Sequence, residues 1–298
     1  MVSDGAQASS PADNLLLVVN PNASGVAEPG AAVARASTAL RTRGANVETR
    51  VTDGPGELDE LLDAAHGRRV VLLGGDGTLH AAVNRPRPLP ELALLPAGGA
   101  NNIATSLGIP TELGAAAALA VEGRARAIDL IDARCGERHC IGIEGASVGF
   151  HAVARARYRA RNSTEIWTAV RAAASALRRF RGSSVVVETD GVVRGGRIAQ
   201  LFVANLPLYG FELLVAPRAS AEDGMLDVVI WEWRSRAALL PLFVRLRIGG
   251  TDATAWQGKR IHLDTGQSPL ICDTTDLGRG RAELTVLPGE LALVTPPR

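Results

Sequence analysis

Cysteine is scarce in this chain, and the few that occur are not arranged like metal ligands or disulfide partners. The 298 residues contain only Cys135, Cys140 and Cys272, with no Cys-x-x-Cys pair. An odd count without such a pair argues against a disulfide framework and against a structural zinc site. The five histidines likewise show no spacing typical of metal ligands. This composition predicts a cytoplasmic protein.

Long apolar runs and a large net charge are also missing. No apolar run reaches the roughly 18 residues that a membrane-spanning helix requires. Residues 1–13 have neither a basic start nor an apolar stretch, so we expect a disordered tail and no signal peptide. A formal charge of +1 gives no global attraction to nucleic acid, and no recognition motif for nucleic acid is present. The sequence therefore predicts no nucleic-acid partner.

The apolar residues that are present are sufficient for two domains, since 46% of the chain is hydrophobic and 21% is charged. We place the first domain at residues 14–127 and the second at residues 128–298, and we expect the last residues to pack back on the first domain. In the first domain, strands at 15–19, 46–51, 70–73 and 92–95 alternate with helices at 31–43, at 57–66 and from residue 79 onward. This alternation predicts a three-layer α/β domain with a mostly parallel sheet.

The pattern of the second domain is different. Short apolar segments separated by turn signals predict strands at 184–188, 198–205, 226–231, 260–263, 284–287 and 291–294. Helices are expected only at 166–180 and 237–247. Several short strands with frequent turns favour an antiparallel sandwich, so the second domain is predicted to be rich in β structure.

Three turns rich in Gly, Asn and Ser follow strands of the first domain. They are Asn20 to Gly25 (NPNASG), Gly74 to Thr78 (GGDGT) and Pro96 to Asn102 (PAGGANN). Ligands of parallel sheets bind beyond the carboxyl ends of the strands, so we expect these turns to lie at one edge. The middle turn is not a Walker A loop, because no Lys follows its last Gly.

Glycine amides and the N-terminus of the next helix would still favour phosphate groups at this edge. Asp76 would repel phosphate unless Mg²⁺ lay between them, or unless it accepted a proton from the attacking hydroxyl. The alternative is an ordinary tight turn in which Asp76 caps a helix.

Taken in this order, the three turns resemble the diacylglycerol kinase catalytic family. That family includes bacterial lipid kinases and the sphingosine and ceramide kinases, and it is distantly similar to NAD kinases. The resemblance continues through Ala127 to Leu130, Glu144 to Phe150, Asn205 to Gly210, Asp223 to Val228 and Pro288-Gly289. It implies an ATP- and Mg²⁺-dependent lipid kinase that phosphorylates a hydroxyl of a diacylglycerol-like or sphingoid lipid.

The resemblance also implies which residues act. The nucleotide would contact Asn20, Ser24, Gly25, Thr52, Gly74, Gly75, Asp76, Gly77, Thr78, Gly98 and Asn101. Asp223 resembles the acidic residue that helps to hold a structural Mg²⁺ in bacterial lipid kinases. The competing interpretation of Asp223-Gly224 is an ordinary hairpin turn.

The chain departs from the family in three places. Gly99 stands where the family commonly has Thr, and Phe211-Glu212 interrupts a glycine-rich turn. Thr275 occupies the position of the Glu that is thought to act as general base, and a hydroxyl cannot accept a proton at neutral pH. Either Asp276 or Asp76 would then serve as the catalytic base. The alternatives are a catalytically impaired nucleotide-binding protein and a kinase of a soluble hydroxyl compound such as NAD.

A cluster of arginines suggests how the protein would contact a membrane that contains its lipid substrate. From Arg155 to Arg181 the chain carries eight arginines against a single acid, Glu165, which would favour an anionic membrane surface. Trp167, Phe180 and the Trp231–Trp233 pair are further candidates for the membrane interface. The segment Leu239 to Gly250 has an apolar body and a basic tail. We therefore expect peripheral membrane association, with a homodimer left open by the sequence.

Overall fold

The computed structural model describes residues 14–65, 67–85, 88–159, 166–210, 212–249 and 253–297. The predicted tail at residues 1–13 lies outside these ranges. The chain forms two compact units, Met1–Ala127 together with Leu291–Arg298, and Ile128–Glu290. No helix within the described ranges is long and apolar enough to span a membrane.

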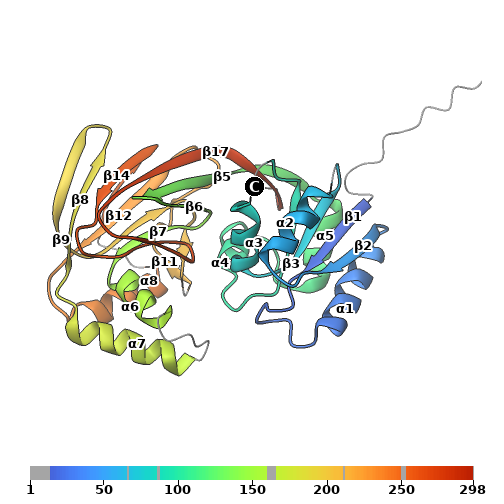
Figure 1. The fold of residues 1–298 in the computed structure, drawn as a ribbon, viewed down its shortest axis with the longest axis horizontal. Coiled ribbons are helices and arrows are strands. Elements are labelled where there is room, and N and C mark those ends of the chain that lie inside the picture. The colour runs from blue at the N-terminus through green and yellow to red at the C-terminus, as the bar shows by residue number, and fades with distance from the viewer. Residues whose placement is uncertain are drawn as a thin grey trace, which may run out of the picture. The chain divides into compact units, whose positions relative to one another are not determined.

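The first unit is a parallel sheet with helices on both faces (Figure 1). Its strands are β1 (Asn14–Val19), β2 (Asn46–Val51), β3 (Arg69–Gly74), β4 (Leu92–Pro96) and the end of β17 (Arg281–Thr295), in the order β2-β1-β3-β4-β17. Its helices are α1 (Pro29–Arg41), α2 (Pro55–Asp63), α3 (Asp76–Val83), α4 (Asn102–Ser106) and α5 (Leu113–Glu122). The predicted α/β fold of this part is confirmed.

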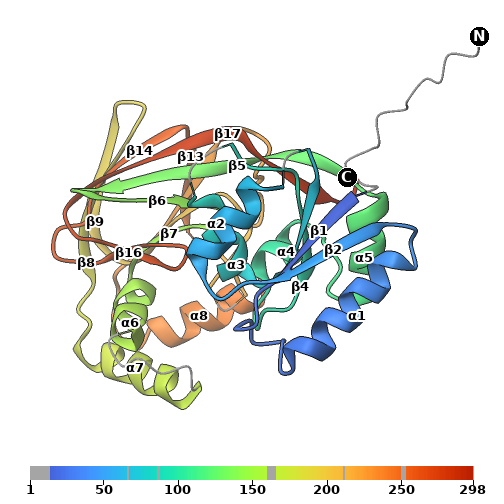
Figure 2. The same cartoon turned by 45° about the vertical axis from the view of Figure 1, so that its right-hand side comes forward.

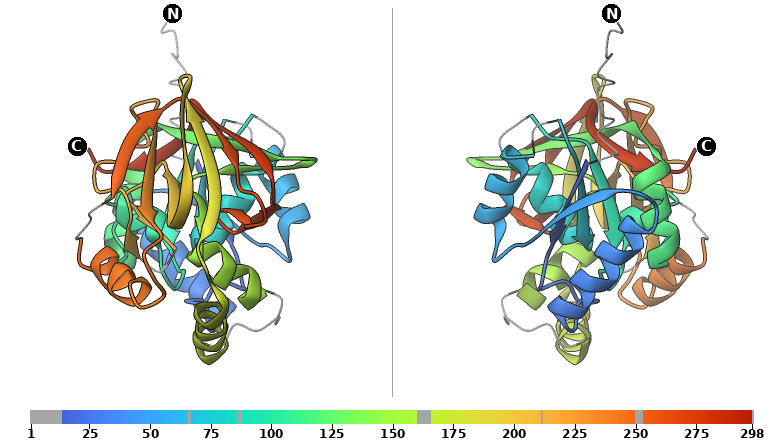
Figure 3. Two further views of the ribbon diagram at one scale, coloured as in Figure 1. Left: turned by 90° about the vertical axis from the view of Figure 1, so that its left-hand side faces the viewer. Right: turned by 90° about the vertical axis from the view of Figure 1, so that its right-hand side faces the viewer.

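The central strands of this sheet are apolar on both faces because helices cover both. Leu15 and Leu17 of β1 pack in one cluster with α1 and α5, while Leu16 and Val18 point to the opposite face. Helices α2 and α3 lie on that opposite face (Figure 3). The buried guanidinium of Arg69 donates to the carbonyls of Val121 (3.2 Å) and Gly123 (3.0 Å), so β3 fixes the end of α5.

The second unit is built mainly from antiparallel strands. They are β5 (Arg124–Cys135), β6 (Arg138–Gly142), β7 (Gly145–Gly149), β8 (Ser183–Thr189), β9 (Val192–Ala204), β10 (Leu208–Tyr209), β11 (Leu213–Leu214), β12 (Leu226–Glu232), β13 (Thr254–Gly258), β14 (Arg260–Asp264), β15 (Leu270–Cys272), β16 (Thr275–Gly278) and the first part of β17. Its helices are α6 (Phe150–Arg159), α7 (Ile166–Arg179) and α8 (Leu239–Arg247), which lie together beside the strands (Figure 2). The β-rich second domain is confirmed.

Strand β9 shows how the layers of the second unit are divided. Leu201 and Val203 belong to the cluster enclosed between strands, whereas Phe202 and Ala204 belong to the cluster beneath the helices. Alternate residues of one strand therefore serve two cores. Residues 198–204, where both faces of the strand are covered, are therefore apolar except for Gln200, whereas the first six residues of β9 are exposed.

Two aromatic residues expected at a membrane interface lie in the core instead. Phe180 and Trp231 are only 6% and 5% exposed and belong to the cluster beneath the helices. Trp233 packs edge-on against Phe180, with ring centroids 5.3 Å apart. The side chain of Trp167 lies outside the described residues. The proposed interfacial role of Phe180 and Trp231 is thus wrong, because both rings complete an apolar core.

The predicted break between the strands at 284–287 and 291–294, around Pro288-Gly289, is also absent. The structure has one continuous strand, β17, in place of the two predicted strands at 284–287 and 291–294. Gly289 has a φ of 64°, and its amide donates to Asp129 at 2.8 Å. The buried side chains change from even to odd positions across this point. At Pro288-Gly289 the strand therefore keeps its direction, but the side chains that are buried change from even-numbered to odd-numbered positions.

A buried histidine lies in the core of the second unit. His151 is 6% exposed, and its Nδ1 lies 3.1 Å from the hydroxyl of Ser147, while its Nε2 has no hydrogen-bond partner. Burial, with a smaller contribution from the charge of Arg155, lowers the pKa of His151 to about 3. This histidine is therefore neutral in the folded protein at neutral pH.

Acid is expected to destabilise the protein through His151. The unfolded chain takes up this proton near pH 6.5 and the folded chain only near pH 3, so the stabilisation is complete above pH 6.5 and is lost as the pH falls. Between pH 7.5 and 5 this group should remove about 2 kcal/mol from the free energy of unfolding. Denaturant titrations should show that His151→Gln has a smaller pH dependence than the wild type. Equal pH dependence of the two proteins would contradict the assignment.

Candidate active site

The three glycine-rich turns lie at one edge of the first unit. β1, β3 and β4 are adjacent and parallel, so the segments that follow them emerge on the same side. Backbone hydrogen bonds join the segments, from Gly25 N to Ala97 O at 2.8 Å and from Ala97 N to Gly74 O at 2.7 Å. The edge is thus one connected set of turns.

Four of the predicted phosphate-binding glycines are required for close packing at this edge, and a Cβ on the first of them, Gly25, would lie 2.8 Å from the carbonyl oxygen of Ala97. A Cβ on Gly75 would lie 2.7 Å from the Cα of Gly98, and a Cβ on Gly98 would lie 2.7 Å from the Cα of Gly75. A Cβ on Gly74 would overlap the side chain of Thr78. By contrast, a Cβ on Gly77 would meet nothing within 4 Å. Gly25, Gly75 and Gly98 thus permit close backbone approach, Gly74 leaves room for the side chain of Thr78, and Gly77 borders open space.

Several predicted ligands use their side chains to build the turns. The hydroxyl of Thr78 accepts a hydrogen bond from Asn20 at 2.8 Å and is 5% exposed. The hydroxyl of Thr52 donates to the carbonyl of Gly54 at 2.7 Å and is also buried. Asn101 forms two hydrogen bonds with the backbone of Gly98, at 2.8 and 3.0 Å. These four side chains hold the site in shape.

Asp76 has a defined structural partner. Its Oδ2 accepts from the amide of Asn102 and its Oδ1 from the amide of Ile103, both at 3.0 Å. These amides belong to the first turn of α4, where a negative charge stabilises unpaired donors. Asn101, the N-cap residue of α4, has a left-handed φ of 51° and uses its side chain on Gly98. Asp76 therefore caps a helix, although not the one that follows it in the chain.

The remaining predicted residues form the exposed part of the edge. Ser24, Gly25 and Gly77 are exposed, and so is Gly99. A Cβ on Gly99 would lie 3.3 Å from the hydroxyl of Ser24, so a threonine there would crowd this serine. The N-terminus of α3, where Gly75 is the N-cap residue, carries a partial positive charge and presents backbone donors. Such donors suit phosphate oxygens.

The second unit holds the segment in which, from the resemblance, Thr275 is expected to stand in place of a glutamate. Asp273 precedes it, is 6% exposed, and accepts from the amides of Ile143 (2.7 Å), Glu144 (3.0 Å) and Gly145 (3.0 Å). Its φ of 45° is left-handed, which a single residue such as Asp tolerates. Asp273 thus fixes the turn between β15 and β16 against the turn between β6 and β7.

Asp276 lies on β16 one residue after Thr275, so the two side chains point to opposite faces of the strand. Its Oδ1 accepts from the amide of Gly278 at 2.9 Å and lies 4.0 Å from the guanidinium of Arg138. This position gives Asp276 a structural partner on β6, away from the side that Thr275 faces.

One buried carboxylate escaped the sequence analysis. Glu144 is 6% exposed, and its amide is one of the three that Asp273 holds. The pKa of the neighbouring Cys272 thiol is raised by a hydrogen bond with Cys140, by burial and by nearby negative charges that include Asp273 and Glu144. Cys272 pairs with Thr275 across β15 and β16. Glu144 therefore lies close to the turn that carries Asp273 and Thr275.

The turn that contains Asp223 is held by the buried carboxylate of Asp129. Asp129, 3% exposed, accepts from the amides of Gly224 (2.7 Å) and Gly289 (2.8 Å). Asp223 itself is exposed and accepts from the amide of Met225 at 3.0 Å. Burial raises the pKa of Asp227, and the charge of Asp223 raises it further, so these two carboxylates lie near each other.

Matched substitutions should separate packing glycines from glycines that border open space. Gly75→Ala is expected to lower the free energy of unfolding by about 1–3 kcal/mol, because the new methyl group meets the backbone of Gly98. Gly77→Ala should be neutral or stabilising by up to about 1 kcal/mol, because alanine favours the helix and meets nothing. Denaturant titration of both proteins tests this difference. Equal stabilities would show that the two turns do not pack as described.

The chain is similar to known proteins along most of its length. The diacylglycerol kinase catalytic domain model matches residues 14–133, and the YegS C-terminal NAD kinase beta sandwich-like domain model matches residues 145–295. A YegS-like lipid kinase of Pseudomonas aeruginosa is 31% identical over 276 residues, covering 85% of this chain and 87% of the relative. A diacylglycerol kinase of Mycobacterium tuberculosis is 28% identical over 286 residues, covering 90% of this chain and 91% of the relative.

The fold is shared with a solved structure as well. A diacylglycerol kinase from Bacillus anthracis superposes with a TM-score of 0.73 at 19% identity, covering 96% of this chain and 97% of that one. Two matching models in the expected order account for both units. The chain therefore belongs to the diacylglycerol kinase catalytic-domain family of lipid kinases.

Proposed function

We propose that the chain transfers the γ-phosphoryl group of ATP to a hydroxyl of a diacylglycerol-like or sphingoid lipid. The observation that carries this proposal is the edge of the first unit, where Ser24, Gly77 and Gly99 are exposed on turns held rigidly by the side chains around them. Phosphoryl transfer depends chiefly on positioning and electrostatic stabilisation, which preorganised amide donors supply. The lipid acceptor is supported by the names of the relatives.

The proton acceptor is assigned to Glu144. In the reaction, the lipid hydroxyl oxygen bonds to the γ-phosphorus as the bond to the bridging oxygen of ADP breaks, and the hydroxyl proton passes to a carboxylate. Asp76 is engaged with the amides of α4 and Asp276 faces Arg138. Glu144 lies in the turn that Asp273 fixes, near Thr275, and it would replace the missing glutamate. Asp273 would act as its positioning residue.

Mg²⁺ is compatible with the carboxylates of Asp223 and Asp227. Both are hard oxygen donors, and burial, together with the nearby charge of Asp223, raises the pKa of Asp227. Among the described residues no cluster of three or more His, Cys, Asp or Glu side chains is suited to a metal. Mg²⁺ needs few protein ligands because it retains several waters, so a pair of carboxylates is sufficient. A bound ion would neutralise this pair and stabilise the turn that Asp129 holds.

The transfer can be tested with γ-labelled ATP, Mg²⁺ and mixed micelles of lipid extract, with labelled lipid separated by thin-layer chromatography. Glu144→Gln should lower the rate of labelling by about 10²–10⁴-fold, because it removes the proton acceptor and keeps the shape of the side chain. ATP binding, measured by calorimetry, should be unchanged in this variant. Glu188→Gln, an exposed substitution on β8, is the matched control.

Two outcomes of that assay would contradict parts of the proposal. A larger loss in Asp276→Asn or Asp76→Asn than in Glu144→Gln would transfer the role of base to that aspartate. The absence of labelled lipid for the wild type, despite ATP binding, would favour a nucleotide-binding protein without turnover, for which Thr275 is the specific observation. Label in a soluble compound such as NAD would instead identify a soluble acceptor.

The metal assignment has a test that needs no activity. Without nucleotide, Mg²⁺ should raise the thermal midpoint of the wild type, and Asp223→Asn should abolish that increase because one of the two carboxylates is lost. Asp190→Asn, at the tip of the β8–β9 hairpin where φ is 51°, is the control, since Asn tolerates this conformation. An Mg²⁺-dependent shift that survives in Asp223→Asn would place the ion elsewhere.

A further inference from the structure

Helix α8 is apolar on two opposite faces. Leu239, Leu242 and Leu246 face the core of the second unit and are at most 9% exposed. On the other side, Leu240 is 70% exposed, Val244 52% and Ile248, the C-cap residue, 76%. Positions i, i+4 and i+8 lie along one stripe of a helix. An apolar stripe facing away from the core requires an apolar partner if it is to be removed from water.

Basic residues flank this stripe, and no acidic residue occurs on the helix. Arg247 lies beside the stripe on one side and Arg245 on the other, as the spacing of 100° per residue requires. Both are exposed, and Arg247 also pairs with Glu212. A helix with an apolar stripe between arginines has the composition of helices that lie in a membrane interface.

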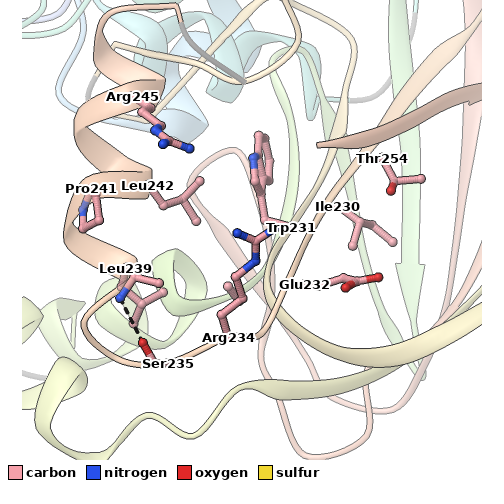
Figure 4. Close-up of a pocket in the computed structure, with 12 residues that line it drawn as sticks. Ile230, Trp231, Glu232, Arg234, Ser235, Leu239, Pro241, Leu242, Arg245 and Thr254 are labelled. Atoms are coloured by element: carbon pink, nitrogen blue, oxygen red, sulfur yellow. Dashed lines mark hydrogen bonds between the residues drawn. The ribbon is translucent and has the colours of Figure 1, made fainter. Parts of the chain in front are cut away.

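A cavity of about 420 Å³ lies beside α8. It is lined by Arg245, Leu242 and Pro241 from the helix and by Trp231, Glu232 and Arg234 from the end of β12 and the residues after it, among others. Figure 4 shows the side chains of Arg245 and Arg234 extending from the two sides toward the space between Leu242 and Trp231. Glu232 lies on a different side of the cavity in the same view.

The cavity also contains a buried donor that lacks an acceptor. Trp231 is 5% exposed and its indole Nε1 has no hydrogen-bond partner. Two guanidinium groups and an unsatisfied N–H beside leucine side chains suit a ligand that is anionic at one end and apolar at the other. The phosphate of a phospholipid headgroup, with its acyl chains along the exposed stripe, meets both requirements.

The arginines at the end of α7 are on the same side of the unit. Arg236, just before α8, donates to the carbonyl of Phe180 at 3.0 Å, and Phe150 of α6 packs against both Phe180 and Phe243. The exposed Arg178, Arg179 and Arg181, which flank Phe180 in the chain, therefore lie near the beginning of α8. Their charge would attract the same anionic surface at longer range.

We infer that α8 and the adjacent cavity form a docking surface for an anionic phospholipid bilayer. Leu240, Val244 and Ile248 enter the interface between headgroups and acyl chains, and Arg234 and Arg245 bind a headgroup phosphate in the cavity. This inference draws on the proposed function only in that a lipid acceptor lies in a membrane. Attachment to a bilayer is a property separate from phosphoryl transfer, and it is measured without nucleotide.

The test is co-sedimentation of the full chain with phosphatidylcholine vesicles, with and without phosphatidylglycerol. The wild type should bind the anionic vesicles and bind phosphatidylcholine alone much more weakly. The triple variant Leu240→Ser, Val244→Ser, Ile248→Ser should lower the partition coefficient by at least about tenfold, since three apolar side chains no longer enter the bilayer. Arg234→Gln with Arg245→Gln should lower binding to anionic vesicles by about fivefold for each charge.

A matched control uses apolar residues exposed elsewhere in the same unit. Val186, Val192 and Val193 on the β8–β9 hairpin are 46%, 50% and 62% exposed, and their triple serine variant should bind as the wild type does. Far-UV circular dichroism would establish that each variant folds. The inference is overturned if the wild type ignores anionic vesicles, if it binds neutral vesicles equally, or if the α8 variant behaves like the hairpin control. Because ATP is omitted, vesicle binding is measured independently of phosphoryl transfer. A chain without kinase activity can still bind vesicles, and an active kinase can still fail to bind them.

Discussion

The backbone contact between Gly75 and Gly98 is the constraint on which the candidate site depends. β3 and β4 are neighbouring parallel strands, and the turns that follow them meet with no room for a Cβ on either glycine. This approach places Asp76 over the first amides of α4, and it allows Asn101 to hold the backbone of Gly98. The edge is thereby held in shape by its own contacts, which would lower the conformational-entropy cost of the nucleotide binding proposed above.

The residues of the turn from Gly74 to Thr78 have two different roles. Gly74, Gly75 and Thr78 are buried and shape the turn, while Gly77 is exposed at the beginning of α3. Residues of one predicted phosphate-binding motif therefore differ in role, since some shape the turn and Gly77 is exposed. Asp76 is the clearest case, because its carboxylate caps α4.

Much of the first unit could be predicted from sequence because its strands are buried on both faces and end in strong turn signals. Val70 to Leu73 is a clear example, since four apolar residues are followed by glycines. What could not be predicted were partners distant in sequence. The helix that Asp76 caps begins 26 residues later, and the turn that Asp273 holds lies some 130 residues earlier. Local patterns carry no information about such pairs.

The helices that sequence analysis missed have a different cause. α5 is almost entirely small and apolar, so it shows no polar face, and α6 alternates alanine or valine with arginine in a way that resembles a strand. Glu144 was overlooked because a glutamate in a glycine-rich turn normally suggests an exposed position, whereas the fold buries it. Such residues are identified by their burial and their neighbours, neither of which is visible in a single sequence.

Strand β17 has a consequence for how the chain is made. Its first part pairs with β14 in the second unit, and residues from Leu291 onward belong to the first unit, where Leu293 pairs with Leu92 of β4. During synthesis, the first unit is therefore translated early and yet remains without its edge strand until the whole second unit has emerged. β4 presents unpaired backbone groups throughout that interval, which makes it a candidate site for chaperone binding on the nascent chain.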